Sequence, residues 1–245
     1  MEVIERISYD IEKSAERIES ILSAGNDSFS DREQVPSRNE LDYTNGYYVH
    51  VAALFIDIIG SSRLTDEHTP ETLAKIYRSY ISECIALING SSLCKEICIH
   101  GDCVYGIFDT AQKADIDSVF SIAAGLNSLV RILSDKLRKK GLSGITAGIG
   151  MDHGRVLMVK SGNPECGLNN VIWMGDAVNH ACHYSEEAGR EGRKPMVVSA
   201  GVYGNLSRKN QKLLTSYYSS SERTILYEGN AFDAAMEKWY DGHCK

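Results

Sequence analysis

Between residues 47 and 159, short apolar runs and long helical patterns follow one another in an order that constrains the fold more than any other feature. Four apolar runs have the length of strands, at 47–58, 93–99, 104–108 and 145–151. Amphipathic periodicity predicts two helices, over 72–89 and 114–139. The order strand, helix, strand, strand, helix, strand is that of the ferredoxin-like split unit. We therefore expect an α+β domain.

The pattern continues beyond this unit. The residues Asp152, His153 and Gly154 read as the turn of a second hairpin, with its strands at 145–151 and 155–159. The elements expected next are a strand at 171–173, a helix from Asp176 to about Ala188 and a strand at 196–199. Residues 215–245 carry several Tyr and Ser residues and show no pattern that predicts an element.

The N-terminal segment Glu2–Ala24 places isoleucines at three- and four-residue spacing between charged residues, which predicts an amphipathic helix. The pattern is short, so the helix is equally compatible with packing on its own domain and with pairing to a second chain. Gly25–Gly46 is polar and reads as a linker. The expected division is an N-terminal helix and linker over 1–46 and a folded domain over 47–245.

Two carboxylates stand at the ends of apolar runs, Asp57 in Phe55–Ser62 and Asp102 in the turn His100–Cys103. Magnesium is commonly held by one or two carboxylates plus substrate phosphates, and two such ions stabilise both oxygens of an in-line displacement. After Asp57 come Gly60, Ser61 and Ser62, whose free amides at a helix start would face a triphosphate. Taken singly, each motif is equally a strand end or a turn.

A third segment, Ile172–Ala181, combines an apolar run, a glycine turn and a helix start with Asn179 one turn in. With all three in this order, the chain resembles the class III nucleotidyl cyclases from about Val49 to about Glu187. Residues 146–154 match a further strand of that family. The resemblance implies a central, mostly antiparallel sheet with flanking helices and a site shared between two catalytic domains, and hence a head-to-tail homodimer.

The resemblance also implies roles for individual residues. Asp57, Asp102 and the carbonyl of Ile58 would hold two divalent cations, Mg²⁺ or Mn²⁺, and Asn179 of the partner would orient the ribose. His183 stands where the family usually has an Arg that neutralises the transferring phosphoryl group. The alternatives are that His180 or Arg193 supplies this charge, or that His183 is a solvated helix residue.

The base pocket departs from the adenylate cyclases, which usually carry a Lys and an Asp or Thr where this chain has Cys98 and Ile172. Neither side chain offers the strong hydrogen bonds that read an adenine ring. In this the chain resembles the pyrimidine cyclases of the Pycsar antiphage systems. That resemblance implies cyclic UMP made from UTP, as a second messenger sensed by a separate effector protein in antiphage defence.

Three other functions fit the same motifs: a cytidylate cyclase, an adenylate cyclase with an altered base pocket, and an inactive cyclase fold that binds nucleotides. The intact Asp57 and Asp102 argue against the inactive fold. A diguanylate cyclase would show a Gly-Gly-Asp/Glu-Glu-Phe hairpin, whereas this hairpin reads His-Gly-Asp-Cys at residues 100–103.

Composition limits the partners, the cellular location and the cysteine chemistry that we expect. A net charge of −7 argues against a nucleic-acid partner. No apolar run approaches the length of a membrane span, and the acidic N-terminus is unlike a signal peptide, so a cytoplasmic protein without a membrane partner is expected. The seven cysteines are odd in number and lie mostly in apolar runs, which disfavours disulfides. A zinc site made of Cys94, Cys98, His100 and Cys103 is disfavoured, because their spacing has no paired C-x-x-C and strand alternation would put Cys98 and Cys103 on opposite faces.

Overall fold

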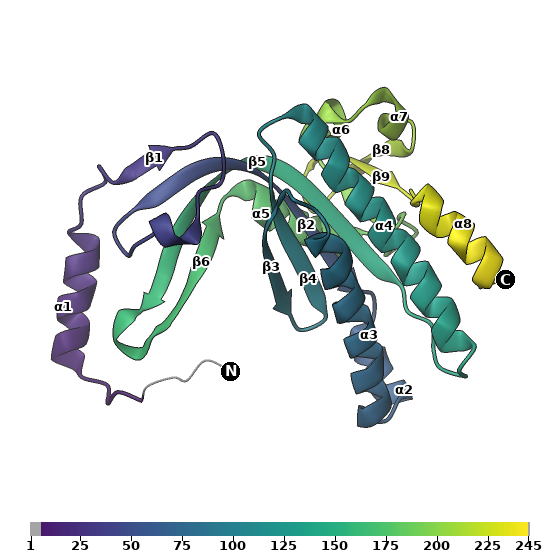
Figure 1. The fold of residues 1–245 in the computed structure, drawn as a ribbon, viewed down its shortest axis with the longest axis horizontal. Coiled ribbons are helices and arrows are strands. Elements are labelled where there is room, and N and C mark those ends of the chain that lie inside the picture. The colour runs from purple at the N-terminus through teal and green to yellow at the C-terminus, as the bar shows by residue number, and fades with distance from the viewer. Residues whose placement is uncertain (1–5, 245) are drawn as a thin grey trace.

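The computed structural model describes residues 6–244 and has the shape of an arch built on one nine-stranded sheet (Figure 1). The strands are β1 (Phe29–Asp31), β2 (Gly46–Ile58), β3 (Cys94–His100), β4 (Cys103–Asp109), β5 (Ala147–Asn163), β6 (Leu168–Met174), β7 (Met196–Val198), β8 (Leu214–Ser219) and β9 (Thr224–Gly229). The helices are α1 (Ile11–Leu22), α2 (Ser61–Glu67), α3 (Pro70–Asn89), α4 (Lys113–Arg138), α5 (Asp176–Glu187), α6 (Ala200–Asn205), α7 (Arg208–Gln211) and α8 (Ala234–His243).

The two longest strands, β2 and β5, form the span of the arch. β2 pairs with β5 in antiparallel register along its whole 13-residue length, from Gly46 opposite Val159 to Ile58 opposite Ala147. The sheet continues in the order β3-β4-β2-β5-β7-β9-β8, with β1 added to β2 and β6 added to β5. The only parallel pairs among the described strands are β1 with β2 and β5 with β7. The expected mostly antiparallel α+β fold is therefore confirmed.

The hairpin predicted around Asp152 is wrong, because β5 runs straight through it and Asp152 pairs with Ala53. The polar residues that suggested a turn point to opposite faces of the sheet, Asp152 toward α5 and His153 toward His50 on the other face. The Asp152 carboxylate accepts from the His153 amide at 2.7 Å and lies 3.2 Å from Nδ1 of His180 on that helix. A side chain at Gly154 would lie 3.3 Å from the methyl group of Ala177, so this glycine lies in close contact with α5.

Helices cover both faces of the sheet. On one face α3 and α4 enclose a core that includes Leu54, Tyr80, Phe108, Phe120 and Leu126. On the other face α5 packs on a second core that includes Val51, Phe55, Val156, Trp173 and Ala181. We expected no segment long and apolar enough to span a membrane. This expectation is wrong, because α4 is long and apolar enough by length and composition alone. Since 67% of its most apolar window is buried in the protein, α4 has the character of a core helix.

The N-terminal region differs from the expected linker. α1 begins after the capping residue Asp10 and has no buried residue, and Nη1 of its Arg17 lies 3.4 Å from Oε2 of Glu165. The helix therefore contacts its own domain through an ion pair and buries no apolar side chain there. Residues Glu2–Glu5 of the predicted helix lie outside the described residues. Within the segment expected to be a linker, β1 pairs with β2 and Leu41 is buried, which ties this segment to the sheet.

The C-terminal segment, for which no element was predicted, forms β8, β9 and α8. Strand β9 joins the sheet beside β7, and β8 forms the sheet edge. α8 is held against α4 by hydrogen bonds from Arg131 to Glu237 and from Tyr240 to Asp135.

The close approach of α5 to β5 generates a prediction. A methyl group at Gly150 would lie 2.1 Å from the carbonyl oxygen of Ala181, so Gly150→Ala must displace the helix. We expect a loss of about 3 kcal/mol in the free energy of unfolding, measured by urea denaturation. The control is Gly204→Ala, since a methyl group there has nothing within 4 Å. Equal stability of the two variants would contradict this packing.

Candidate active site

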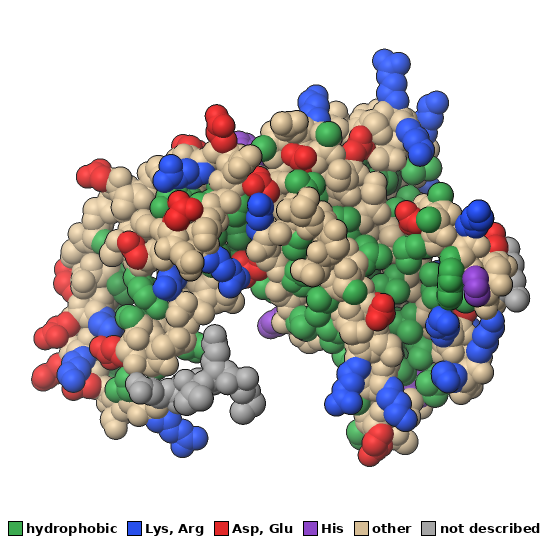
Figure 2. Space-filling model, viewed as in Figure 1, with side chains coloured by type: hydrophobic (Ala, Val, Ile, Leu, Met, Phe, Trp, Pro, Cys, Tyr) green, Lys and Arg blue, Asp and Glu red, His purple; other side chains and the backbone are tan. Residues whose placement is uncertain are grey.

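The structure brings the two predicted metal carboxylates together. Asp57 lies near the end of β2, and Asp102 lies in the β3–β4 turn, which pairing of Ile56 with Val104 sets beside that end. Both side chains line a cavity of about 640 Å³. Its other lining residues are Phe55, Cys98, Ile99, His100, Gly101, Cys103, Tyr105, Asn170, Cys182, Ser185 and Glu186. The strand and helix walls of this cavity belong to β2, β3, β4, β6 and α5, and Figure 2 shows the surface hollowed beneath the arch.

The described residues do not fully offset the cost of burying the two carboxylates. Burial raises the pKa of Asp57 above its usual range, and the neighbouring charge of Asp102 raises it further. Oδ2 of Asp102 is buried and has no hydrogen-bond partner among the described residues. A buried anionic oxygen without a partner is costly, and a bound cation removes that cost. The donor set therefore fits hard cations such as Mg²⁺ or Mn²⁺.

Arg190 is the cation that lies beside this pair. Its Nη2 donates to Oδ2 of Asp57 at 3.1 Å, and its Nη1 donates to the Ser185 carbonyl oxygen at 2.9 Å. The loop after α5 positions it, and there Glu191 has a φ of 50° and Gly192 a φ of 81°. Because a loop conformation rather than a periodic pattern sets this contact, sequence reasoning missed Arg190.

Arg193, one of the cations considered from the sequence, lies elsewhere. Its guanidinium stacks over the Tyr217 ring at 3.7 Å and lies 3.9 Å from Glu228. His180, the other alternative, faces Asp152 on β5. Neither residue lines the cavity of the two carboxylates.

The segment after Asp57 is arranged for a sharp turn into α2. Ile58 is buried and pairs with Ala147, so Asp57 is anchored by the sheet on both sides. Gly60 has a φ of +70°, which only glycine adopts without strain, and Ser61 then begins α2. The Ser61 side chain hydrogen-bonds to Tyr77 of α3, whereas Ser62 is exposed.

One chain does not bring the predicted catalytic residues of α5 to the carboxylates. Asn179 is exposed, and His183 is exposed with its Nδ1 at 3.2 Å from Oε1 of Glu222. Neither lines the carboxylate cavity, to which α5 contributes Cys182, Ser185 and Glu186 instead. Asn179 and His183 thus stand on the surface of the chain that carries them.

The two predicted base-pocket residues are placed differently. Cys98 lines the cavity, where its thiol donates to Oε1 of Glu96 at 3.5 Å and contacts Tyr105. Glu96 is only 6% exposed and accepts from Nε1 of Trp173 at 2.7 Å. Ile172 is 43% exposed and does not line this cavity. Sequence reasoning missed Glu96 and Tyr105, although a glutamate inside an apolar strand run is a usable signal of a buried polar contact.

The cysteines are free thiols throughout. The argument that strand alternation separates Cys98 from Cys103 is wrong, because they lie on different strands of one hairpin and both line the cavity. Burial raises the pKa of Cys103 to about 12, which disfavours the thiolate that zinc requires. Within residues 6–244, no cluster of three or more His, Cys, Asp or Glu side chains is arranged to hold a metal ion.

The chain is similar in sequence to a known family and to individual proteins. Residues 44–223 match the family model of the adenylate and guanylate cyclase catalytic domain. The chain is 33% identical to a uridylate cyclase of Treponema porcinum over 95% of its own length and 81% of the relative. It is 34% identical to a uridylate cyclase of Gulbenkiania mobilis, over 90% of the chain and 85% of that relative.

Solved structures agree in fold. The adenylyl cyclase CyaB from P. aeruginosa superposes with a TM-score of 0.63 at 17% identity, over 76% of this chain and 95% of that one. A class III adenylyl cyclase-like ATP-binding protein from Pseudomonas aeruginosa superposes with a TM-score of 0.56 at 14% identity, over 96% of this chain and 48% of that one.

The ion pair of Asp57 with Arg190 generates a prediction for the metal-free protein. Because Arg190 lowers the pKa of Asp57 against the effect of burial, Arg190→Ala should raise that pKa further. A raised carboxyl pKa in the folded state costs stability as pH rises through it, so the variant should lose about 1 kcal/mol near neutral pH. Toward acid pH, where Asp57 is protonated in both proteins, the difference should shrink.

The measurement is the carboxyl ¹³C titration of Asp57 together with urea denaturation at neutral and acid pH. Arg193→Ala is the matched control and should leave the titration of Asp57 unchanged, since Arg193 contacts Glu228 and Tyr217. An unshifted Asp57 titration in Arg190→Ala would contradict the assignment.

Proposed function

The chain belongs to the adenylate and guanylate cyclase catalytic domain family, and from this premise we propose that it is a uridylate cyclase that converts UTP to 3′,5′-cyclic UMP and pyrophosphate. The nucleotidyl cyclase class follows from the family match. The proposal that the base is uracil rests on one observation. The chain is 33% and 34% identical to two proteins named uridylate cyclase, across nearly its whole length.

In the proposed reaction the ribose 3′-oxygen attacks the α-phosphorus in line, and the bond from that phosphorus to pyrophosphate breaks. Asp57 and Asp102, with the carbonyl of Ile58, would hold two divalent cations, Mg²⁺ or Mn²⁺. When bound, these ions lower the pKa of the 3′-hydroxyl and neutralise the triphosphate. The buried, unpartnered Oδ2 of Asp102 supports this role. The turn Gly60, Ser61 and Ser62 would bind triphosphate oxygens.

A second copy of the chain would complete the site in a head-to-tail homodimer. Asn179 is proposed to orient the ribose from the partner subunit, with His183 nearby to donate to the transferring phosphoryl group. Their exposure, away from their own chain's carboxylates, supports this arrangement. Exposed apolar side chains suited to such an interface include Ile99, Leu168, Ile172 and Met174.

Arg190 is proposed as the cation on the metal side of the site. It lies against Asp57 within one chain, so it reaches the triphosphate region without a partner. An Arg there compensates for the absence of the family's usual Arg at position 183, because a guanidinium offers a fixed fork of donors to phosphate oxygens.

For the base, Cys98 and Ile172 are proposed to line the pocket, with Tyr105 beside Cys98. The product would be a second messenger read by an effector protein in antiphage defence, as in the family that the sequence resembles.

Base preference tests the proposed substrate. Purified protein incubated with each of the four ribonucleoside triphosphates and Mn²⁺ should make cyclic UMP above all, identified by mass spectrometry. Purine polar groups left unpaired cost about 1–3 kcal/mol each, or roughly tenfold in kcat/KM. Cys98→Lys combined with Ile172→Asp should erode the preference for UTP. Dominant turnover of CTP, or comparable turnover of ATP and UTP, would contradict the assignment of the base.

The two carboxylates test the chemistry. Asp57→Ala and Asp102→Ala should each abolish cyclisation with Mn²⁺, since charge neutralisation by metal ions is worth several kcal/mol. Asp66→Ala, which removes an exposed carboxylate from α2, is the control and should retain activity. Circular dichroism should show all three variants folded. Near wild-type turnover by either site variant would contradict the two-metal assignment.

A further inference from the structure

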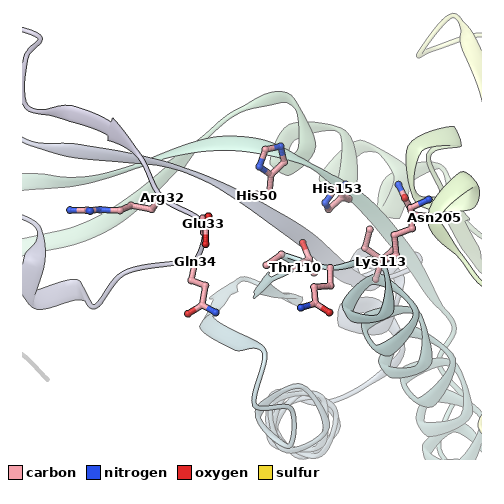
Figure 3. A pocket seen from close by; sticks show the side chains of 11 residues that line it. Arg32, Glu33, Gln34, His50, Thr110, Lys113, His153 and Asn205 are labelled. Carbon is pink, nitrogen blue, oxygen red and sulfur yellow. The ribbon is translucent and has the colours of Figure 1, made fainter.

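A polar cavity of about 630 Å³ lies apart from the two carboxylates, at the amino end of α4 (Figure 3). It is lined by Arg32, Glu33, Gln34, His50, Thr110, Ala111, Gln112, Lys113, Ile116, His153 and Asn205. His50 and Asp57 stand on opposite faces of β2 and about 23 Å apart along it, because residues of a strand alternate and advance by about 3.3 Å each. The volume is in the range of small-molecule sites.

Thr110 is the residue of this cavity that most directly indicates a ligand. It is only 3% exposed, and its hydroxyl has no hydrogen-bond partner among the described residues. It lies between β4 and α4, in the wall of the cavity. A buried hydroxyl normally has a partner, so an unpaired one in a residue that lines a cavity suggests that a ligand oxygen supplies it.

The surroundings of Thr110 favour an anion. Lys113 is the first residue of α4, a helix of 26 residues whose amino end carries partial positive charge. At this end the Gln112 amide donates to the Asp115 carboxylate at 2.8 Å. The ring of His153 hydrogen-bonds to the main chain of Thr110 and stacks on His50 with centroids 6.1 Å apart. Burial and the charge of His50 lower the pKa of His153, and a bound anion would offset both effects. Figure 3 shows these side chains around the start of α4.

The far wall carries the only carboxylate among the lining residues, Glu33, beside Arg32 and Gln34 in the segment after β1. A carboxylate accepts hydrogen bonds from hydroxyl groups. The cavity thus joins an anion-binding end at α4 to a hydroxyl-binding end at Glu33, which is the chemistry of a sugar phosphate or a nucleoside monophosphate.

We propose that this cavity binds a small phosphate-bearing molecule, with the phosphate held by the Thr110 hydroxyl, Lys113 and His153 at the amino end of α4 and a ligand hydroxyl held by Glu33. The site is separate from the proposed cyclase site and does not depend on it.

Isothermal titration calorimetry of the full chain in EDTA, with inorganic phosphate and with UMP as probes, tests the site. Thr110→Val and Lys113→Ala should each weaken binding about tenfold, the effect of one lost hydrogen bond to a charged group. Lys139→Ala, at the other end of α4, is the matched control and should bind normally. Thr110→Val should not lose stability, because it removes a hydroxyl that has no partner in the free protein.

Imidazole ¹H–¹³C NMR locates the bound probe, since the resonances of His50 and His153 should shift on titration. Binding of both probes supports a phosphate-directed site, and tighter binding of UMP than of phosphate supports the role of Glu33. Binding that persists unchanged in Thr110→Val and Lys113→Ala, or that is lost in Asp57→Ala, would overturn the proposal. So would an absence of binding at millimolar probe.

Discussion

The pairing of β2 with β5 is the interaction on which the rest of the structure depends. These strands share a register from Gly46 to Ile58, and every other strand attaches to them directly or through a neighbour. Their alternation sends Leu54 and Ile56 into the core under α3 and α4 while Asp57 stands on the face covered by α5. A shift of one residue would exchange these faces, moving Asp57 into the apolar core, so the same ladder sets both the core and the site.

Charge is the second constraint. Asp57 and Asp102 lie beside one cavity, and the described residues supply Arg190 as the ion-pair partner of Asp57. Two neighbouring carboxylates favour the binding of cations. In the metal-free chain, Arg190 forms an ion pair with one of the two carboxylates, that of Asp57. Asn179 and His183 are exposed, and in the proposed function they complete the site of a partner subunit. In the proposed function, two divalent cations and a partner subunit complete this site.

Much of the site was predictable because it depends on local pattern. Asp57 and Asp102 follow from apolar runs that end in acidic turns, and Cys98 follows from the resemblance, since it stands where the adenylate cyclases usually carry a Lys. Three features were not predictable for physical reasons. Asp152 looks like a turn residue until α5 supplies His180 as its partner. Arg190 reaches Asp57 only through the backbone conformation of a loop.

The third such feature is the polar segment 25–46, which reads as a linker because its contacts are made by few residues. Leu41 is buried, and the pairing of β1 with β2 involves the main chain, which side-chain patterns do not report. The fold class was nevertheless predictable, since it rests on the order of strands and helices.

If Asp57 of one chain and Asn179 of its partner act in one site, mixing two inactive variants of the chain should restore activity. Asp57→Ala and Asn179→Ala variants, each impaired alone, are mixed under conditions in which subunit exchange is verified, and cyclic UMP formation is measured. We expect recovery to about a quarter of wild-type activity at equal mixing, because about half of the dimers are then mixed and each mixed dimer holds one of its two sites free of both substitutions. No recovery despite verified exchange would contradict it.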